Sequence, residues 1–119
     1  MVIDVCVVGG GPAGLMAGIF AARGGAEVIV LERNTTAGRK LLRTGRGRCN
    51  VTHVGSVKEL IGAYDKFGRF LRHSLHEFSG EDMVGFLGDY GLKCKVEKNG
   101  CVFPDTDRAT DVKLSLIHI

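Results

Sequence analysis

The sequence has no two cysteines at CxxC spacing, only two prolines, and no apolar run approaching the length of a membrane span. Its four cysteines are Cys6, Cys49, Cys94 and Cys101, and their spacing indicates neither a zinc knuckle nor a dithiol redox centre. The first apolar stretch is short, is interrupted by Asp4 and lacks a basic leader, so we expect no signal peptide. These absences favour reduced thiols and a cytoplasmic location.

Glycine, in contrast, is abundant. The chain holds 18 glycines among 119 residues, about twice the usual share. Without a collagen or linker period, this content indicates a backbone that approaches something closely. The net charge of +3 is too small to argue for nucleic-acid binding by itself.

The first 32 residues predict a β-α-β unit. Residues 2–8 form a short β-branched run that is typical of a buried parallel strand. Residues 12–23 are rich in Ala, Leu and Met, with Pro12 at the first helical position. Gly24 and Gly25 end this helix, and residues 26–32 form a second strand. Such a crossover is expected to be parallel and right-handed.

The rest of the chain predicts a loop, two helices and a hairpin. The loop covers residues 33–55, with a helical turn near 40–42, and a helix follows over 57–76. Ser79 is a candidate N-cap for a helix that Gly91 ends. The Asn99-Gly100 turn then joins two strands, residues 94–98 and 101–103.

The most informative motif lies between the first strand and the first helix. Gly9, Gly11 and Gly14 fit the GxGxxG pattern, and the β-α-β context makes this pattern specific. The first glycine permits a tight turn, the second lets a pyrophosphate lie against the backbone, and the third allows close helix packing. The N-terminus of the helix offers free N–H groups to phosphates.

Glu32 ends the second strand. At this position a carboxylate accepts hydrogen bonds from both hydroxyls of an adenosine ribose, and it repels a 2′-phosphate. The alternative is a Gly-rich turn followed by an exposed glutamate.

A basic segment follows directly. It contains Arg33, Arg39, Lys40, Arg43, Arg46 and Arg48, interleaved with glycines. The segment has no aromatic residue, which argues against stacking on nucleic-acid bases. A solvated surface remains possible, but the glycines favour backbone that wraps a compact anion and runs along a dinucleotide.

Longer motifs carry a family resemblance. They are GGGPAG at 9–14, LERN at 31–34, GRKLLRTGRGRCNVTH at 38–53, FLRHSL at 70–75 and GCVFPDTDRATDV at 100–112. Through them, residues 1–112 resemble the bacterial NAD(P)/FAD-dependent oxidoreductases of the BaiN/RdsA type, also described as aminoacetone-oxidase-family FAD-binding enzymes. Arg46 and His53 depart from the family, which usually has a small residue or Gly at position 46 and Asn at 53.

The resemblance implies the α/β class, as a partial Rossmann-type FAD-binding domain with helices and a β-hairpin after the β-α-β unit. It implies an FAD cofactor, with NAD(P)H as a possible electron donor in the full-length parent. The implied FAD contacts, with Gly10 added from the same glycine run, are Gly9, Gly10, Gly11, Pro12, Ala13, Gly14, Glu32, Arg33, Lys40, Arg48, Cys49 and Asn50. No catalytic acid or base is identified, and we expect Cys49 to pack beside the cofactor rather than to react.

Family members are several times longer than this chain. We therefore interpret residues 1–113 as the N-terminal part of an FAD-binding domain that is inactive alone. Residues 114–119, LSLIHI, resemble a non-native tail, and the alternative is the native start of a strand or helix.

Two rival functions remain open. One is the nucleotide-binding domain of an NAD-dependent dehydrogenase, against which the long basic loop argues. The other is a non-catalytic module that binds a nucleotide or RNA through that loop. The four histidines show no metal spacing, so we expect no metal site, and we expect neither nucleic acid nor a membrane as partner.

Overall fold

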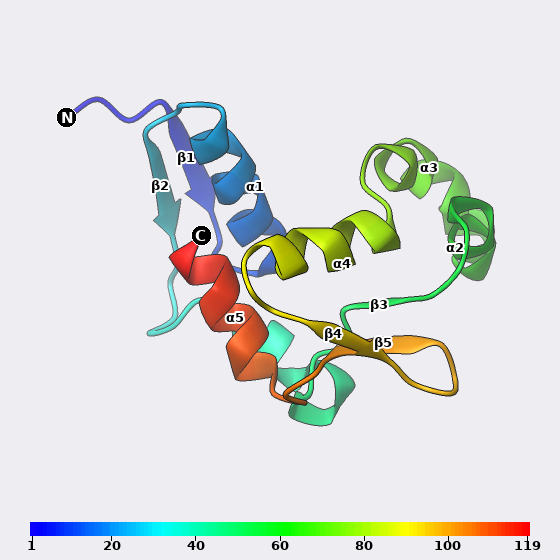
Figure 1. Ribbon diagram of the computed structural model, residues 1–119. Coiled ribbons are helices and arrows are strands. Elements are labelled where there is room, and N and C mark those ends of the chain that lie inside the picture. Colours follow the sequence, from blue (N-terminus) through cyan, green and yellow to red (C-terminus); the bar gives the residue numbers. More distant parts are fainter. The chain divides into compact units, whose positions relative to one another are not determined.

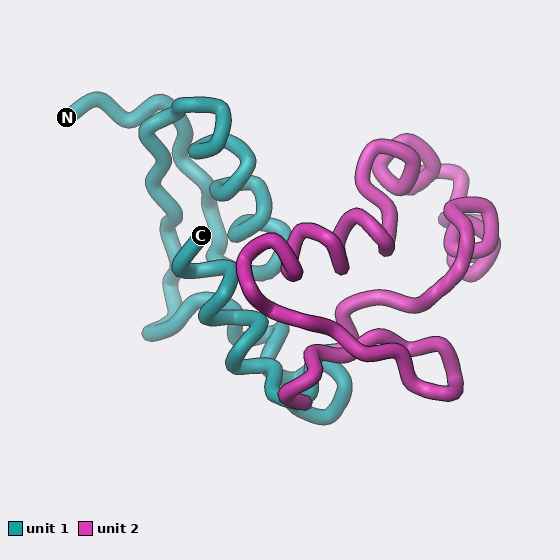
Figure 2. The backbone as a smooth tube through the Cα atoms, in the orientation of Figure 1, with its two compact units in different colours: residues 1–49, 108–119 teal, residues 50–107 magenta.

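The computed structural model describes all residues, 1–119, and divides them into two compact units. The first unit comprises residues 1–49 and 108–119, and the second comprises residues 50–107 (Figure 2). None of the helices combines the length and the apolar character needed to cross a membrane.

The first unit begins with the expected β-α-β arrangement (Figure 1). Strand β1 (Val5–Val8) leads into helix α1 (Pro12–Arg23), which is followed by strand β2 (Val28–Leu31). The two strands pair in parallel, with Val5 opposite Val28 and Val8 opposite Leu31. The predicted helix bounds are confirmed, whereas both strands are shorter than the apolar runs that contain them. The α/β prediction and the Rossmann-type connection are therefore confirmed.

Small and apolar side chains attach α1 to the sheet. A Cβ atom on Gly18 would lie 3.3 Å from a methyl group of Val30, so this position has little room for a side chain. Leu15 and Ile19 on the same helix are buried. Helix α5 (Ala109–His118) adds buried side chains to this unit, including Val112 and Leu116. Residues 114–118 thus continue a helix, and their interpretation as a non-native tail stays a prediction.

Between β2 and the second unit, the basic segment contains a short 3-10 element, η1 (Leu41–Gly47). It consists of two turns separated by a kink, in which Gly45 and Arg46 have φ angles of 54° and 58°. The predicted helical turn near 40–42 is therefore one part of a longer, kinked element. Because side chains disfavour this left-handed region, the small residue or glycine that is usual in the family suits position 46 better than arginine.

The second unit contains an antiparallel sheet in the order β3-β5-β4. Strands β4 (Cys94–Val96) and β5 (Cys101–Pro104) form the predicted hairpin, and Gly100 in its turn has a φ of 84°. Strand β3 (Thr52–His53) pairs with β5, although the sequence analysis assigned these residues to a loop. Helix α4 (Gly80–Asp89) packs near β3 and β4.

The single helix predicted over 57–76 was wrong. The structure has α2 (Val57–Ala63), the 3-10 turn η2 (Asp65–Phe67) and α3 (Gly68–Glu77), and Figure 1 shows the bend between α2 and α3. Asp65 has a left-handed φ of 49°, which interrupts the helical path. Gly68 then approaches Ile61 so closely that a Cβ would lie 2.0 Å from its carbonyl oxygen. This contact between neighbouring helices explains the break.

Two of the three α-helices of this unit, α2 and α4, begin with a capping box. Ser79 Oγ accepts from the backbone N–H of Asp82, whose carboxylate accepts from the N–H of Ser79, so the predicted N-cap is confirmed. Ser56 and Glu59 form the same arrangement at the start of α2. The Ser-x-x-Glu spacing at 56–59 is a sequence signal that the analysis above did not use.

Candidate dinucleotide-binding site

The glycine loop connects β1 to α1 with the geometry that its sequence pattern requires. Gly9 has a φ of 102° and donates to the Leu31 carbonyl at 2.7 Å, which ties the turn to the end of β2. A Cβ on Gly14 would lie 1.9 Å from the Gly9 carbonyl oxygen, so no larger residue fits there. The loop and the first helical turn are thus packed in direct contact.

The N-terminus of α1 is open to a ligand. Pro12 is the first helical residue, Gly11 is the N-cap, and no side chain caps this end of the helix. The first turn carries no acidic side chain that would compete with an anion. A Cβ on Gly11 would meet no protein atom within 4 Å, so its absence is not required by the protein's own packing. Backbone N–H groups such as that of Ala13 suit a phosphate here.

Glu32 links the glycine loop to the segment after β2. Its Oε2 accepts from the Gly10 N–H at 2.9 Å, and its Oε1 accepts from the Asn34 N–H at 2.8 Å and from Asn34 Nδ2 at 2.6 Å. These donors, first the Asn34 backbone and then Gly10, hold the pKa of the Glu32 carboxyl below its ordinary value. The carboxylate is therefore charged and fixed in orientation, which a ribose-binding acceptor requires.

Asn34 is itself oriented by a neighbour. Its Oδ1 accepts from Arg39 Nη1 at 3.2 Å, which leaves Nδ2 to face Glu32. The sequence analysis quoted Asn34 and Arg39 within motifs but did not place them in the site. The sequence signal for both residues was their position, because they lie within seven residues of Glu32, which directly follows β2.

A depression of about 510 Å³ collects several of these groups. It is lined by Gly11, Glu32, Asn34, Arg39, Lys40 and Arg43. The structure thus places Gly11, Glu32 and Lys40, three of the predicted site residues, around one cavity. It adds two cations, Arg39 and Arg43, to the one predicted there. One acidic and three basic side chains suit a ligand that carries both hydroxyl groups and phosphates.

A second depression of about 700 Å³ shares Glu32 and lies at the carboxyl ends of β1 and β2. Arg33 lines it together with Val8, Gly9 and Leu31. This edge of a parallel sheet is where ligands bind in open α/β folds. Arg33 and Lys40 therefore line different depressions on the two sides of Glu32.

The GRCN block divides between the two units. Arg48 closes η1 with a hydrogen bond from its N–H to the Gly45 carbonyl at 3.2 Å. Cys49 is only 5% exposed, and burial raises the pKa of its thiol, which disfavours the reactive thiolate. This agrees with the expectation that Cys49 packs rather than reacts. Asn50 belongs to the second unit, where its amide nitrogen faces the Thr52 carbonyl at 2.8 Å.

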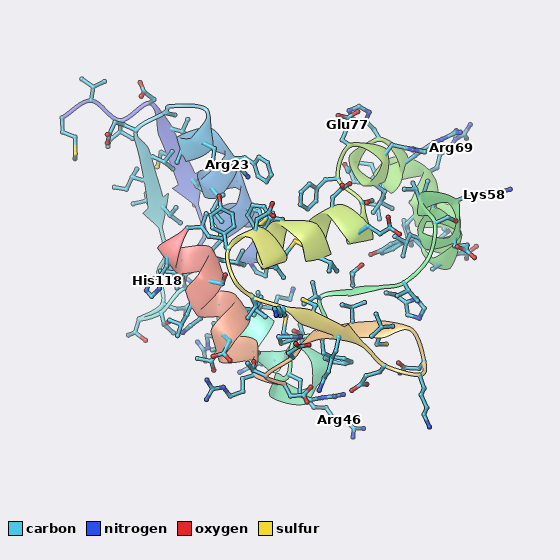
Figure 3. All side chains as sticks on the ribbon, in the orientation of Figure 1. Arg23, Arg46, Lys58, Arg69, Glu77 and His118 are labelled. Atoms are coloured by element: carbon cyan, nitrogen blue, oxygen red, sulfur yellow. The ribbon has the colours of Figure 1, made fainter.

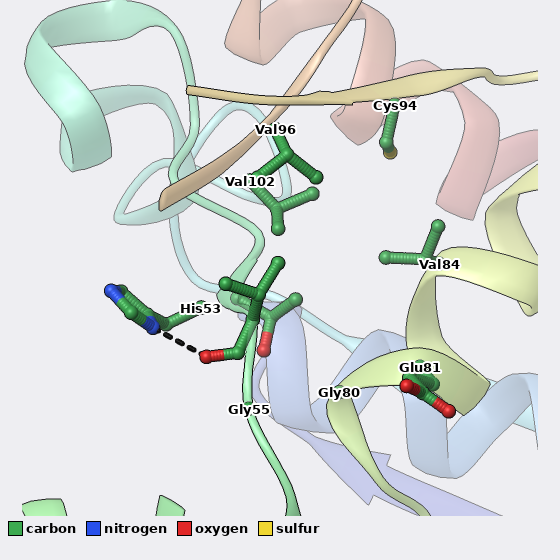
Figure 4. A pocket seen from close by; sticks show the side chains of 10 residues that line it. His53, Gly55, Gly80, Glu81, Val84, Cys94, Val96 and Val102 are labelled. Atoms are coloured by element: carbon green, nitrogen blue, oxygen red, sulfur yellow. Dashed lines mark hydrogen bonds between the residues drawn. The ribbon is translucent and has the colours of Figure 1, made fainter. Parts of the chain in front are cut away.

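The second unit has its own cavity, of about 220 Å³, which no sequence motif indicated (Figure 4). Its walls are largely apolar, with Val84, Val96 and Val102 around Cys94, and Glu81 lies at one side. His53 Nδ1 lies 2.7 Å from the Val54 carbonyl oxygen, and this contact is the dashed line in Figure 4. No group of three His, Cys, Asp or Glu side chains in the chain is arranged to hold a metal ion.

The fold and the first unit's site together define a Rossmann-type dinucleotide-binding domain. The family model for the HI0933-like protein Rossmann domain matches residues 3–118, and the chain belongs to this family. The resemblance to BaiN/RdsA-type flavoprotein oxidoreductases is thereby confirmed.

Curated relatives agree with this assignment. The chain is 35% identical over 108 residues to the 3-dehydro-bile acid delta(4,6)-reductase of Clostridium scindens, a match that covers 89% of the chain and 26% of the relative. It is 28% identical over 103 residues to the ribosomal RNA dihydrouridine synthase of Escherichia coli, covering 86% of the chain and 25% of that protein. A shorter match, 36% over 63 residues, covers 53% of the chain and 19% of the thioredoxin reductase of Helicobacter pylori. The chain thus spans about a quarter of the length of its first two relatives.

Proposed function

We propose that this chain holds the adenosine and pyrophosphate part of FAD in a flavin-dependent reductase. The observation that carries the proposal is the placement of Glu32 and Gly11 around one cavity, with the helix N-terminus uncapped beside them. The residues fit this half of the cofactor. Glu32 accepts from the ribose hydroxyls, the backbone of 11–14 faces the phosphates, and Lys40 neutralises phosphate charge.

Glu32 favours binding of FAD or NAD over NADP, because its carboxylate repels the 2′-phosphate of NADP. It does not separate FAD from NAD. Here the basic segment supports FAD, because Arg39, Lys40 and Arg43 extend the site beyond the ribose. When bound, the flavin ring supplies hydride transfer between a donor such as NAD(P)H and a substrate. Arg33, Arg48, Cys49 and Asn50 remain proposed contacts to the rest of the cofactor.

The reaction class that we propose is reduction of a carbon–carbon double bond. The names of the Clostridium and Escherichia relatives both describe such a reduction, in a bile acid and in a uridine base. This chemistry needs a hydride donor, which the flavin supplies, and a second part of the protein that holds the substrate.

The cofactor assignment is tested on the flavoprotein that contains this chain. The purified protein should be yellow, and heat-released cofactor should chromatograph as FAD rather than FMN or NAD. A colourless protein that binds NAD would instead support the alternative, an NAD-dependent dehydrogenase. The measurement therefore separates the two cofactors directly.

RNA is a second candidate substrate, and one surface favours it. Helix α3 and the turn before it expose Phe67 and Phe70, whose side chains are 65% and 87% exposed. Phe67 ends η2, and Phe70 follows three residues later in the first turn of α3. Lys66 Nζ lies 5.2 Å from the Phe67 ring centroid, and Arg69 projects outward from α3 (Figure 3). Exposed rings beside cations are typical of single-strand binding surfaces.

The sequence analysis did not predict this surface. It considered RNA binding only through the basic segment, whose lack of aromatic residues argued against RNA. Its test is fluorescence anisotropy with a single-stranded uridine oligonucleotide. Replacing Phe67 and Phe70 together by Ser should weaken binding roughly tenfold or more, since each stacked base contributes about 1–3 kcal/mol. Phe20→Ser on α1 is the matched control, because Phe20 is also exposed and lies beside a cation, Arg23. Equal effects of the two changes would exclude this surface.

A further inference from the structure

Residues 36–38 contact the glycine loop, and of these only Gly38 belongs to a motif quoted in the sequence analysis. The Gly10 carbonyl accepts a hydrogen bond from the Gly38 N–H at 2.7 Å. A Cβ on Gly10 would lie 3.0 Å from the Ala37 side chain. Since Glu32 accepts from the Gly10 N–H, both polar groups of Gly10 have fixed partners.

This arrangement determines where the next N–H points. In a planar trans peptide, the carbonyl of one residue and the N–H of the next point in opposite directions. Because the Gly10 carbonyl faces Gly38, the Gly11 N–H faces away from residues 36–38. The segment 36–38 therefore orients a peptide group of the proposed phosphate site through the Gly10 carbonyl.

Helix α5 in turn holds this segment through one side chain. Lys113 Nζ donates to Thr36 Oγ1 at 3.1 Å, and the Thr36 hydroxyl donates to the Ala37 carbonyl at 3.2 Å. The stem of Lys113 fills the space beside Gly38, where a Cβ would lie 2.7 Å from Lys113 Cγ. Gly38 also has a left-handed φ of 69°, so glycine is required there for two reasons.

We propose that Lys113 is a positioning residue for the dinucleotide: its stem and ammonium group press residues 36–38 against Gly10 and so fix the orientation of the Gly11 N–H. This inference rests on the proposed function, because it assumes that the glycine loop binds a pyrophosphate. Lys113 itself contacts neither the glycine loop nor Glu32 through any hydrogen bond in the structure; it acts through Thr36 and Gly38.

The test uses three substitutions and ADP as the probe, since ADP carries the ribose and pyrophosphate without a flavin. Lys113→Met keeps the stem and removes the donor, Lys113→Ala removes both, and Lys113→Arg keeps a charged donor. ADP affinity is measured on the full chain by amide NMR, which reports the Gly11 and Gly38 signals separately. The same variants in the flavoprotein that contains the chain are measured for FAD loss on dialysis.

We expect Lys113→Met to weaken ADP binding about threefold to tenfold, the factor that one hydrogen bond contributes. Lys113→Ala should weaken it further, and Lys113→Arg should restore it. The Gly38 amide should exchange faster with solvent in the first two variants, while melting temperatures change little. Lys58→Met, at an exposed lysine of α2, is the matched control.

Two failures are distinguishable. If the flavoprotein that contains the unchanged chain binds neither ADP nor FAD, the proposed function is wrong, although Gly38 exchange still reports on the Lys113 contact. If ADP binds but Lys113→Met behaves like Lys58→Met, the positioning role is overturned and the proposed function stands. A loss of affinity that parallels a loss of melting temperature, without rescue by arginine, also overturns it, because it indicates a structural role only.

Discussion

Glu32 accepts a hydrogen bond from the backbone N–H of Gly10 across 2.9 Å, so the end of β2 and the glycine loop form one rigid corner. The two residues are 22 positions apart in the sequence and meet because β1 and β2 pair in parallel. Oε1 already accepts two hydrogen bonds from Asn34, whereas Oε2 accepts one from Gly10 and keeps one lone pair for a ligand. The carboxylate thus shapes the loop, and in the proposed function it also accepts a hydrogen bond from a bound ribose.

Glu32→Ala should weaken FAD binding at least tenfold, because a charged acceptor for two ribose hydroxyls is lost. The measurement is flavin fluorescence titration of the apoprotein. Glu81→Ala, at an exposed glutamate of α4, is the control and should leave affinity unchanged. An affinity for FAD that survives Glu32→Ala would remove this residue from the site.

The same carboxylate predicts a pH dependence. The pKa of Glu32 is lowered in the folded protein by hydrogen bonds to its charged form, so these bonds contribute stability above the unfolded pKa. Their contribution is lost as the pH falls through the lowered folded pKa. The protection factors of the Gly10 and Asn34 amides, which are their exchange rates corrected for the intrinsic pH dependence of amide exchange, should therefore be constant around neutral pH. They should fall only at acid pH, below the ordinary glutamate value of 4.5. A fall in protection near neutral pH would contradict the prediction.

Gly11 and Gly14 should respond differently to a side chain. Gly11→Val should leave the melting temperature nearly unchanged, because no protein atom lies near the added Cβ, yet it should yield colourless protein. Gly14→Ala should lower stability directly, since its Cβ would meet the Gly9 carbonyl oxygen. Thermal melts and flavin absorbance of the two variants check this. A yellow Gly11→Val protein would contradict the phosphate cradle.

The parts of the fold that were predicted are those with local signals. Pro12 marks the start of α1, and Asn99-Gly100 marks the hairpin turn. Strand β3 was missed because it has only two residues and pairs with β5, almost fifty positions later. The candidate site followed the same rule: Glu32 was proposed from its place after a strand, whereas Lys113 contacts Thr36 and Gly38 only through tertiary packing.

The break between α2 and α3 provides a paired test of packing. Gly68→Ala should destabilise the chain by about 1–3 kcal/mol, because the added methyl overlaps the Ile61 carbonyl. Gly62→Ala, in α2 with no atom within 4 Å of the new Cβ, should instead stabilise it by up to about 1 kcal/mol. Urea unfolding curves of both variants decide the point, and equal effects would show that the two helices do not pack as described.

The last prediction concerns the 119-residue chain expressed alone: it should bind FAD no more tightly than micromolar and show no turnover. Its parallel sheet has only two strands, and parallel sheets are normally covered on both faces. Val8 is 86% exposed and Leu31 is 50% exposed, so apolar sheet surface faces solvent. The relatives carry about three quarters of their length outside the matched region.

The energetic reason is that the backbone entropy lost on binding FAD exceeds the free energy that the contacts of this chain with FAD contribute. We expect the basic segment from Arg33 to Arg48 to lose backbone freedom on binding, at about 1 kcal/mol or more per residue that becomes fixed. Against this, the chain offers the ribose contact of Glu32, the phosphate contacts of the glycine loop and the cations of the basic segment. Equilibrium dialysis against FAD, with a circular dichroism melt of the same sample, measures both quantities. A cooperative melt together with nanomolar, one-to-one FAD binding would show that these contacts suffice and that the chain is an autonomous flavin-binding module.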